Sequence, residues 1–318
     1  MISAPAITAI TATALAVLAD IQPKTGLPSG RPVFCRQESA RALVKRKDMK
    51  LGVSTLGCPD WTLDEILTRL PGYGYNGVEL RGLGADLDLT QSPAFATSAI
   101  EETRRRFGDA GLAVCGVDTS CSFAAPDPAA RQRSLEEGRR AIDLAAALGA
   151  PTIRVFGGSI GDEAERTEAA KRVASALAQL GSHAVQTGTV RVVLETHDAF
   201  STGAQVSEVL HQAAHPQVRA LWDLHHPFRQ GEAPTETFRA LGPYVEQTHV
   251  KDSTPDGTYC LLGEGDIPIL EMLRLLKGGG YDGWINLEWE KRWIPALADP
   301  AVAFPQYAAR LHEYLDEL

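Results

Sequence analysis

Ionisable residues follow four successive apolar, β-type runs in the second half of the chain. These runs end in the sequences L-E-T-H-D (194–198), W-D-L-H-H-P (222–227), H-V-K-D (249–252) and N-L-E-W-E (286–290). A charge placed directly after an apolar strand is costly to bury alone, so one such carboxylate would most often belong to an ion pair. Four in succession supply three carboxylates and one imidazole. This donor set predicts one hard divalent cation, with Mn²⁺ as first choice and Mg²⁺, Co²⁺ or Zn²⁺ as alternatives.

The elements that position these residues alternate regularly along the chain. From Met49 onward, short β-rich runs alternate with amphipathic helical runs. Strands are predicted at residues 51–56, 77–81, 113–118, 152–156, 190–196, 219–224, 244–250 and 284–289. Helices are predicted to begin near Thr62, Pro93, Pro128, Glu163, Gly203, Thr235, Ile267 and Ala301.

Eight strand-then-helix units in residues 49–318 predict an α/β fold, a (β/α)₈ TIM barrel with an N-terminal extension. A doubly wound open sheet is the alternative. Such a sheet would require a glycine-rich, dinucleotide-binding loop after an early strand. Residues 54–60, at the end of the first strand, read S-T-L-G-C-P-D instead. In a barrel, the carboxyl ends of all strands meet on one face, so the four polar clusters should lie together there.

Composition narrows the class of protein. The 318 residues carry a formal net charge of −9, which argues against a nucleic-acid or anionic-membrane partner. The sequence has no run of 18 apolar residues, so we expect no membrane-spanning helix. Its five cysteines form no C-x-x-C pair, which favours a reducing, cytoplasmic location. A small-molecule substrate is the expected partner, and a homo-oligomer is left open.

The first 48 residues differ from the rest. They open with an Ala/Thr-rich apolar run and hold seven Lys or Arg against three Asp or Glu, a charge of +4, which leaves −13 for residues 49–318. No basic residue precedes the apolar run, as an export signal would require, whereas a transit peptide stays open. Met49 stands just before the first strand. We therefore expect residues 1–48 to be a disordered or misassigned leader without chemistry.

Taken in order, L-E-T-H, W-D-L-H-H-P, H-V-K-D and N-L-E-W-E resemble the xylose isomerase-like TIM barrels of the sugar phosphate isomerase/epimerase superfamily. The resemblance covers roughly residues 50–315. It implies that the metal is held by Glu195, Asp223, His249 and Glu288. AP endonucleases of the same superfamily need further histidines for three zinc ions, which this sequence lacks, so a nuclease is not expected.

The resemblance also implies the chemistry. A metal polarises a carbonyl and an adjacent hydroxyl, and an enediolate forms when a proton leaves the neighbouring carbon. Glu195 and Glu288 would remove and return that proton, unless they only hold the metal. The expected enzyme is an isomerase or epimerase of a ketose, keto-inositol or related polyol.

Departures from the family leave other activities open. Ketose 3-epimerases carry a Glu and an Arg at positions occupied here by Ser201 and Pro255. The run H-V-K-D is similar to inosose dehydratases, in which Lys251 would act as general acid; otherwise Lys251 forms a salt bridge with Asp252, Glu264 or Glu290. A dehydratase or lyase is thus the second enzyme hypothesis. A barrel that only binds sugar is the non-enzymatic one.

Four more residues are candidates for substrate binding. His226 would donate to the substrate or orient Asp223, and strand parity places His197 on the face of Glu195. Arg154 would bind an oxyanion or hydroxyl, or neutralise a carboxylate such as Glu79. Glu79 is equally a contact for a substrate hydroxyl. Four tryptophans are candidates for lining a sugar-sized pocket or for the core: Trp61, Trp222, Trp289 and Trp293.

Overall fold

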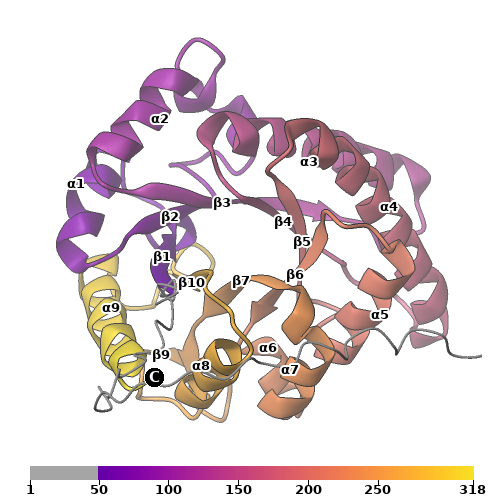
Figure 1. The fold of residues 1–318 in the computed structure, drawn as a ribbon. Coiled ribbons are helices and arrows are strands. Elements are labelled where there is room, and N and C mark those ends of the chain that lie inside the picture. Colours follow the sequence, from indigo (N-terminus) through magenta and orange to yellow (C-terminus); the bar gives the residue numbers. More distant parts are fainter. Residues whose placement is uncertain (1–48) are drawn as a thin grey trace, which may run out of the picture. The chain divides into compact units, whose positions relative to one another are not determined.

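The computed structural model describes residues 49–318, which form a closed barrel of eight parallel strands (Figure 1). Around the barrel the strands follow the order β1, β2, β3, β4, β5, β6, β7, β10, and β10 pairs with both β7 and β1. Their bounds are β1 Lys50–Ser54, β2 Gly77–Leu80, β3 Ala113–Ser122, β4 Thr152–Phe156, β5 Arg191–Glu195, β6 Val218–Asp223, β7 Val245–Val250 and β10 Trp284–Leu287. The prediction of a TIM barrel is confirmed. The proposed leader, residues 1–48, lies outside the described residues.

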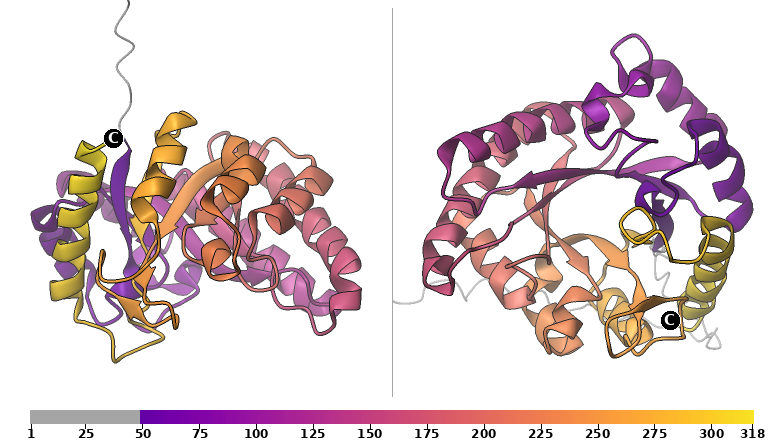
Figure 2. Two further views of the ribbon diagram at one scale, coloured as in Figure 1. Left: turned by 90° about the horizontal axis from the view of Figure 1, so that it is seen from below. Right: turned by 180° about the vertical axis from the view of Figure 1, so that it is seen from behind.

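Helices surround the strands in the views of Figure 2. They are α1 Leu63–Tyr73, α2 Ile100–Asp109, α3 Pro128–Leu148, α4 Arg166–Thr187, α5 Gly203–Ala213, α6 His226–Arg229, α7 Pro234–Leu241, α8 Ile269–Gly278 and α9 Pro300–Asp316. The last of them, α9, packs beside α1 and β1, so the final helix completes the outer layer of helices next to the first one (Figure 1). Within residues 49–318, no helix has the length and apolar character needed to cross a membrane.

Local sequence signals explain where these helices begin and end. Thr62 and Glu65 form a capping box at the start of α1, and Gly74 ends the helix with φ of 94°. Asp127 caps α3 by accepting hydrogen bonds from two backbone amides, and Gly149 ends that helix with φ of 76°. Left-handed φ values of this kind favour glycine, which explains why these two helices end at Gly74 and Gly149.

Some boundaries differ from the predictions. Residues near Pro93 and Glu163 form single 3₁₀ turns, Pro93–Phe95 and Glu163–Glu165, and the helices α2 and α4 begin only afterwards. Two short elements were not predicted: α6, and an antiparallel pair formed by β8 (Asp252–Ser253) and β9 (Tyr259–Cys260). Both lie in loops that follow β6 and β7, on the face where the polar clusters end.

The hydrophobic core fills the space between barrel and helices. Phe304 of α9 is fully buried, and its ring packs edge-on against Trp61 and Tyr75, with ring centroids 5.5 and 6.2 Å apart. Inside the barrel, Gly52 lies so close to Asn286 that an added Cβ would stand 2.0 Å from its Oδ1. A side chain at position 52 would therefore collide with the barrel interior.

Candidate metal centre

Four neighbouring strands bring the four predicted ligands together. Glu195 ends β5, Asp223 ends β6, His249 lies in β7, and Glu288 directly follows β10. The strand register places Asp223 opposite His249, and His249 opposite the residue two before Glu288. All four side chains are buried, and one potential ligand atom from each lies within 4.8 Å of every other. Three carboxylates and an imidazole thus share one small volume.

His249 lies at the centre of this group. Its Nδ1 lies 2.9 Å from Glu195 Oε1 and 3.2 Å from Glu288 Oε2. On the other side of the ring, Nε2 contacts both carboxylate oxygens of Glu79, at 2.9 and 3.0 Å. An Nε2–H that donates to Glu79 fixes the tautomer and the ring plane, which leaves Nδ1 facing the ligand carboxylates.

Buried charges strongly perturb the acids and bases of the cluster. Burial and Glu288 act to raise the pKa of Glu195, but the neighbouring His249 and Arg154 outweigh them and hold it below its usual value. Burial likewise opposes ionisation of Glu288, yet His249 and Lys251 hold its pKa well below the ordinary range. Both glutamates are therefore carboxylates near neutral pH.

One carboxylate oxygen of Asp223 accepts hydrogen bonds from the backbone, and the other faces the cluster. Its Oδ1 accepts hydrogen bonds from the backbone amides of His225 (2.7 Å) and His226 (3.2 Å). Its Oδ2 lies 2.6 Å from Lys251 Nζ. Burial opposes its ionisation, but the charge of Lys251 outweighs burial and places the pKa of Asp223 well below its usual value. The two amides fix the direction in which Oδ2 points.

Lys251 is completely buried on the wall of the same cluster. Its Nζ contacts Asp223, Glu288 and Glu290, the last at 3.2 Å. Of the three salt-bridge partners considered from sequence, only Glu290 is used. Asp252 instead accepts hydrogen bonds from the backbone amides of Gly263 and Gly265, at 2.8 and 3.1 Å. Burial disfavours the charge on Lys251, but the carboxylates outweigh it and raise its pKa well above the ordinary value.

The donor set fits a divalent cation. Two buried oxygens, Glu195 Oε2 and Asp223 Oδ2, have no hydrogen-bond donor among the described residues, although each lies beside a cationic nitrogen. Six carboxyl groups crowd this end of the barrel, against three cationic side chains from Arg and Lys; the carboxyls are Glu79, Asp118, Glu195, Asp223, Glu288 and Glu290. Burial disfavours a charge on His249, but Glu288, Glu79 and Glu195 outweigh it and raise the pKa of His249 well above its usual value, so the imidazolium supplies part of the balancing charge. A divalent cation held by the same residues would take the place of that proton.

Arg154 and Glu79 do not pair with each other. Arg154 Nη2 lies 3.2 Å from Asp118 Oδ2, and its Nε lies 3.3 Å from Glu195 Oε2. Glu79 is bound to His249 and to Gln247 instead. Burial first, and then the charge of Asp118, raises the pKa of Glu79 to about 8. Glu79 therefore lies behind the cluster as a partner of His249.

Two further histidines lie beside the cluster. His226 Nε2 is buried without a hydrogen-bond partner among residues 49–318, 3.7 Å from Asp223 Oδ2, and burial lowers the pKa of its ring. The His197 ring lies 4.7 Å from that of His226, and its Nδ1 lies 2.9 Å from Asp198 Oδ1. Asp198 adopts φ of 51°, an uncommon conformation outside glycine. A neutral His226 with a free ring nitrogen is suited to donate a hydrogen bond to a ligand.

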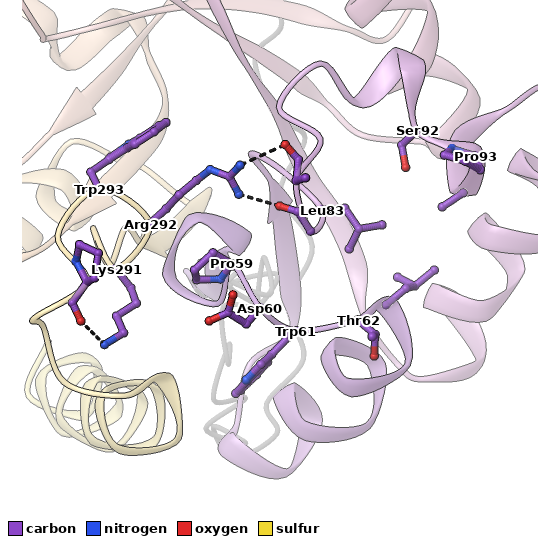
Figure 3. Close-up of a pocket in the computed structure, with 15 residues that line it drawn as sticks. Pro59, Asp60, Trp61, Thr62, Leu83, Ser92, Pro93, Lys291, Arg292 and Trp293 are labelled. Carbon is purple, nitrogen blue, oxygen red and sulfur yellow. Dashed lines mark hydrogen bonds between the residues drawn. The ribbon is translucent and has the colours of Figure 1, made fainter.

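A pocket of about 1010 Å³ opens between the loops that follow β1, β2 and β10 (Figure 3). Its lining includes Trp61, Arg292 and the half-exposed Trp293. Arg292 donates to the carbonyls of Gly84 and Ala85 and so ties two loops together (Figure 3). The other two tryptophans considered from sequence, Trp222 and Trp289, are buried in the core.

Sequence reasoning missed two charged residues in the first half of the barrel. Asp118 lies in β3 with 2% of its surface exposed, and Arg81 directly follows β2 with 5% exposed. Burial and the charge of Arg154 lower the pKa of Arg81 to about 10, so it remains cationic at neutral pH. The signal was available, because both residues end apolar β-type runs in the same way as the four clusters of the second half.

Comparison with known proteins identifies the family. The family model described as "Xylose isomerase-like TIM barrel" matches residues 68–316. The chain belongs to this family. The resemblance inferred from the four motifs is thereby confirmed, whereas the matches below, at low identity, leave the reaction unassigned.

Curated relatives are enzymes with two kinds of reaction. Inosose dehydratase of Lacticaseibacillus casei is 26% identical over 167 residues, which cover 46% of this chain and 53% of the relative, so the chain spans about half the length of that protein. Fructoselysine 3-epimerase of Shigella flexneri is 23% identical over 253 residues, 76% of this chain and 90% of the relative.

Solved structures repeat the fold. The IolI protein, crystallised with a binding zinc atom, superposes with a TM-score of 0.71 at 17% identity, covering 85% of this chain and 99% of that one. At this level of identity, the match supports the barrel architecture alone.

Proposed function

We propose that the chain is a divalent-metal-dependent isomerase or epimerase that acts on a ketose, keto-inositol or related polyol. The observation that carries the proposal is the cluster of Glu195, Asp223, His249 and Glu288, in which two ionised glutamates flank His249 Nδ1 from the two outer strands of four. A cation held by these four residues would polarise the carbonyl and hydroxyl oxygens of the substrate. Hard oxygen donors favour Mn²⁺, and the zinc atom of IolI keeps Zn²⁺ as an alternative.

The two glutamates perform the proton transfer in this proposal. One carboxylate takes the proton from the carbon next to the carbonyl, and the electron pair of that C–H bond moves into the carbonyl system. The other glutamate takes a proton from water and gives it to the opposite face for an epimerase or to the neighbouring carbon for an isomerase, and the first glutamate then releases its proton to water. His226 and His197 bind substrate oxygens beside the cluster, which keeps the reacting carbon between the two carboxylates.

Dehydration is the second candidate, and Lys251 favours it. Its buried ammonium touches Glu288 and lies at the wall of the cluster, where a leaving hydroxyl would need a proton. In that reaction a glutamate removes the carbon-bound proton, the C–O bond at the next carbon breaks, and Lys251 protonates the departing hydroxide to water. The inosose dehydratase relatives support this alternative.

Elemental analysis of the purified protein tests the metal centre. We expect about one divalent ion per chain in the wild type and loss of it in Glu195→Gln and His249→Ala. Glu168→Gln, which alters an exposed carboxylate on α4, is the matched control and should keep the metal. A wild-type protein that binds no metal after reconstitution with Mn²⁺ would refute the proposal.

Isotope and mass measurements then separate the reactions. In deuterium oxide, an isomerase or epimerase incorporates deuterium into a ketose or inosose substrate and leaves the product with the same composition. A dehydratase gives a product lighter by one water. A loaded protein that binds such compounds but exchanges no carbon-bound hydrogen would be a binding barrel, and the enzymatic proposal would be wrong.

A further inference from the structure

Three charged residues form a row across the first half of the barrel, next to the four proposed metal ligands: Arg154 Nε lies 3.3 Å from Glu195 Oε2, and Asp118 Oδ2 lies 3.8 Å from His249 Nε2. They are Arg81 after β2, Asp118 in β3 and Arg154 in β4. Asp118 lies directly opposite Arg154 in the strand register. Leu80 lies opposite Val117, so the next residue, Arg81, comes level with Asp118. All three side chains are at least 95% buried.

Each arginine in this row has a free donor. Arg81 Nη2 donates to Ser120 Oγ at 2.9 Å, and Arg154 Nη2 donates to Asp118 Oδ2 at 3.2 Å. The Nη1 atoms of both arginines are buried and have no hydrogen-bond partner within residues 49–318. A buried, charged donor without an acceptor is costly, so two of them, on either side of β3, point to a missing acceptor.

Aromatic rings fix the planes of both guanidinium groups. The Arg154 group lies 4.0 Å from the centre of the Phe156 ring, and the Arg81 group lies 5.9 Å from that of Trp293. Trp293 also lines the pocket in Figure 3, so Arg81 is the member of the row that lies near a wall of that pocket. A ligand bound at Arg81 would extend toward the pocket past Trp293.

The charge of the row selects the ligand. Two arginines face one aspartate within the row, and the second partner of Arg154 is Glu195, a proposed ligand of the metal. With the metal compensating the charge of Glu195, the row would keep one net positive charge, and each arginine offers a free Nη1. One negative charge with two oxygen atoms matches this arrangement, because guanidinium groups bind planar carboxylates with directed hydrogen bonds. A phosphate ester, with nearly two charges and three oxygens, exceeds what the row supplies.

We propose that Arg81 and Arg154 bind a carboxylate of the substrate, so that the substrate is a sugar acid or a cyclic polyol acid. The inference rests on the proposed function, because the metal cluster would hold the oxygens at the other end of the same molecule. Arg81 is a substrate-binding residue in this arrangement, and Arg154 joins the carboxylate site to the metal cluster through Glu195.

Matched acid and neutral ligands test the inference. Two pairs serve as probes: quinate with methyl quinate, and D-galacturonate with its methyl ester. Each is titrated calorimetrically into Mn²⁺-reconstituted wild-type protein and into the variants Arg81→Gln, Arg81→Lys and Arg105→Gln. Arg105→Gln, the control, removes an exposed guanidinium on α2 that pairs with Glu102 and Asp109. Thermal melting confirms that each variant is folded.

We expect at least one acid to bind wild-type protein about tenfold more tightly than its ester. That preference should disappear in Arg81→Gln, fall in Arg81→Lys, which keeps the charge but loses the planar fork, and persist in the control Arg105→Gln. Failure of both acids to bind at millimolar concentration, equal binding of acid and ester, or a preference that survives Arg81→Gln would overturn the inference. Metal content measured on the same samples distinguishes this failure from failure of the proposed metal centre.

Discussion

Replacement of Glu79 by glutamine would test whether the residue behind His249 sets the affinity of the metal centre. Glu79 contacts His249 Nε2 through both carboxylate oxygens and also accepts a hydrogen bond from Gln247. Glutamine preserves the size of the side chain and one acceptor oxygen but removes the ionisable carboxyl group, whose pKa burial raises to about 8, so that a negative charge is lost mainly above neutral pH. The imidazole would keep its orientation less firmly, and its Nδ1 would become a weaker ligand.

The magnitude follows from what the variant retains. Loss of a partner that orients a ligating histidine typically weakens metal binding by about 10- to 100-fold. Since glutamine can still accept from Nε2–H, we expect about tenfold, or ~1.4 kcal/mol, for Glu79→Gln. Glu79→Ala removes the acceptor entirely and should approach 100-fold, or ~2.7 kcal/mol.

Competition with a fluorescent chelator for Mn²⁺ measures these affinities. Glu290→Gln is the control, because Glu290 contacts Lys251 but not His249. It likewise replaces a carboxyl group near the cluster by an amide, without touching His249, and should change the affinity by less than about twofold. Wild-type affinity in Glu79→Gln would refute the orienting role. An equal loss in both variants would mean that net charge, and not the direction of the imidazole, controls binding.

Three further predictions concern stability, each measured by urea unfolding. Lys251→Met should lower the free energy of unfolding of the metal-free protein by about 3–5 kcal/mol, because buried carboxylates lose their partner; an unchanged value would contradict this. Phe304→Ala should lower the free energy of unfolding by about 3–5 kcal/mol, since the ring is fully buried. A decrease below about 1 kcal/mol would contradict this and would mean that the neighbouring side chains move in to fill the cavity. Gly72 lies in α1 with open space around it, so Gly72→Ala should raise the free energy of unfolding by about 0.5–1 kcal/mol. Gly52→Ala should lower it, because the added methyl group would collide with Asn286. A change of the same sign in both variants would refute the packing argument.

The barrel and the clustering of the ligands were predictable because they depend on local patterns. A short apolar run followed by a helical run appears eight times, and the predicted strand 152–156 agrees with β4 residue for residue. Since all strands are parallel, residues that end them meet on one face whatever their separation in sequence. The grouping of Glu195, Asp223, His249 and Glu288 needed no knowledge of side-chain conformation.

The pairing of charged side chains was less predictable, because it depends on which strands are neighbours and on which backbone amides are available to bind a carboxylate. Arg154 and Glu79 belong to β4 and β2, and β3 lies between them with Asp118, which takes the arginine. Asp252 stands next to Lys251 in sequence, yet its carboxylate turns toward the amides of a glycine-containing loop. No periodicity in the sequence encodes either choice.

The position of β10 couples assembly of the site to completion of the fold. This strand closes the barrel by pairing with β1 on one side and β7 on the other, and Glu288 follows it directly. A chain in which β10 has not yet paired with β7 therefore has at most three of the four proposed ligands in place. A metal that binds only the complete set stabilises molecules in which β10 has paired over molecules in which it has not, and more so at higher metal concentration. Metal present during refolding would thus favour the addition of this last strand, and the amount of bound metal would report the fraction of molecules in which β10 is in place.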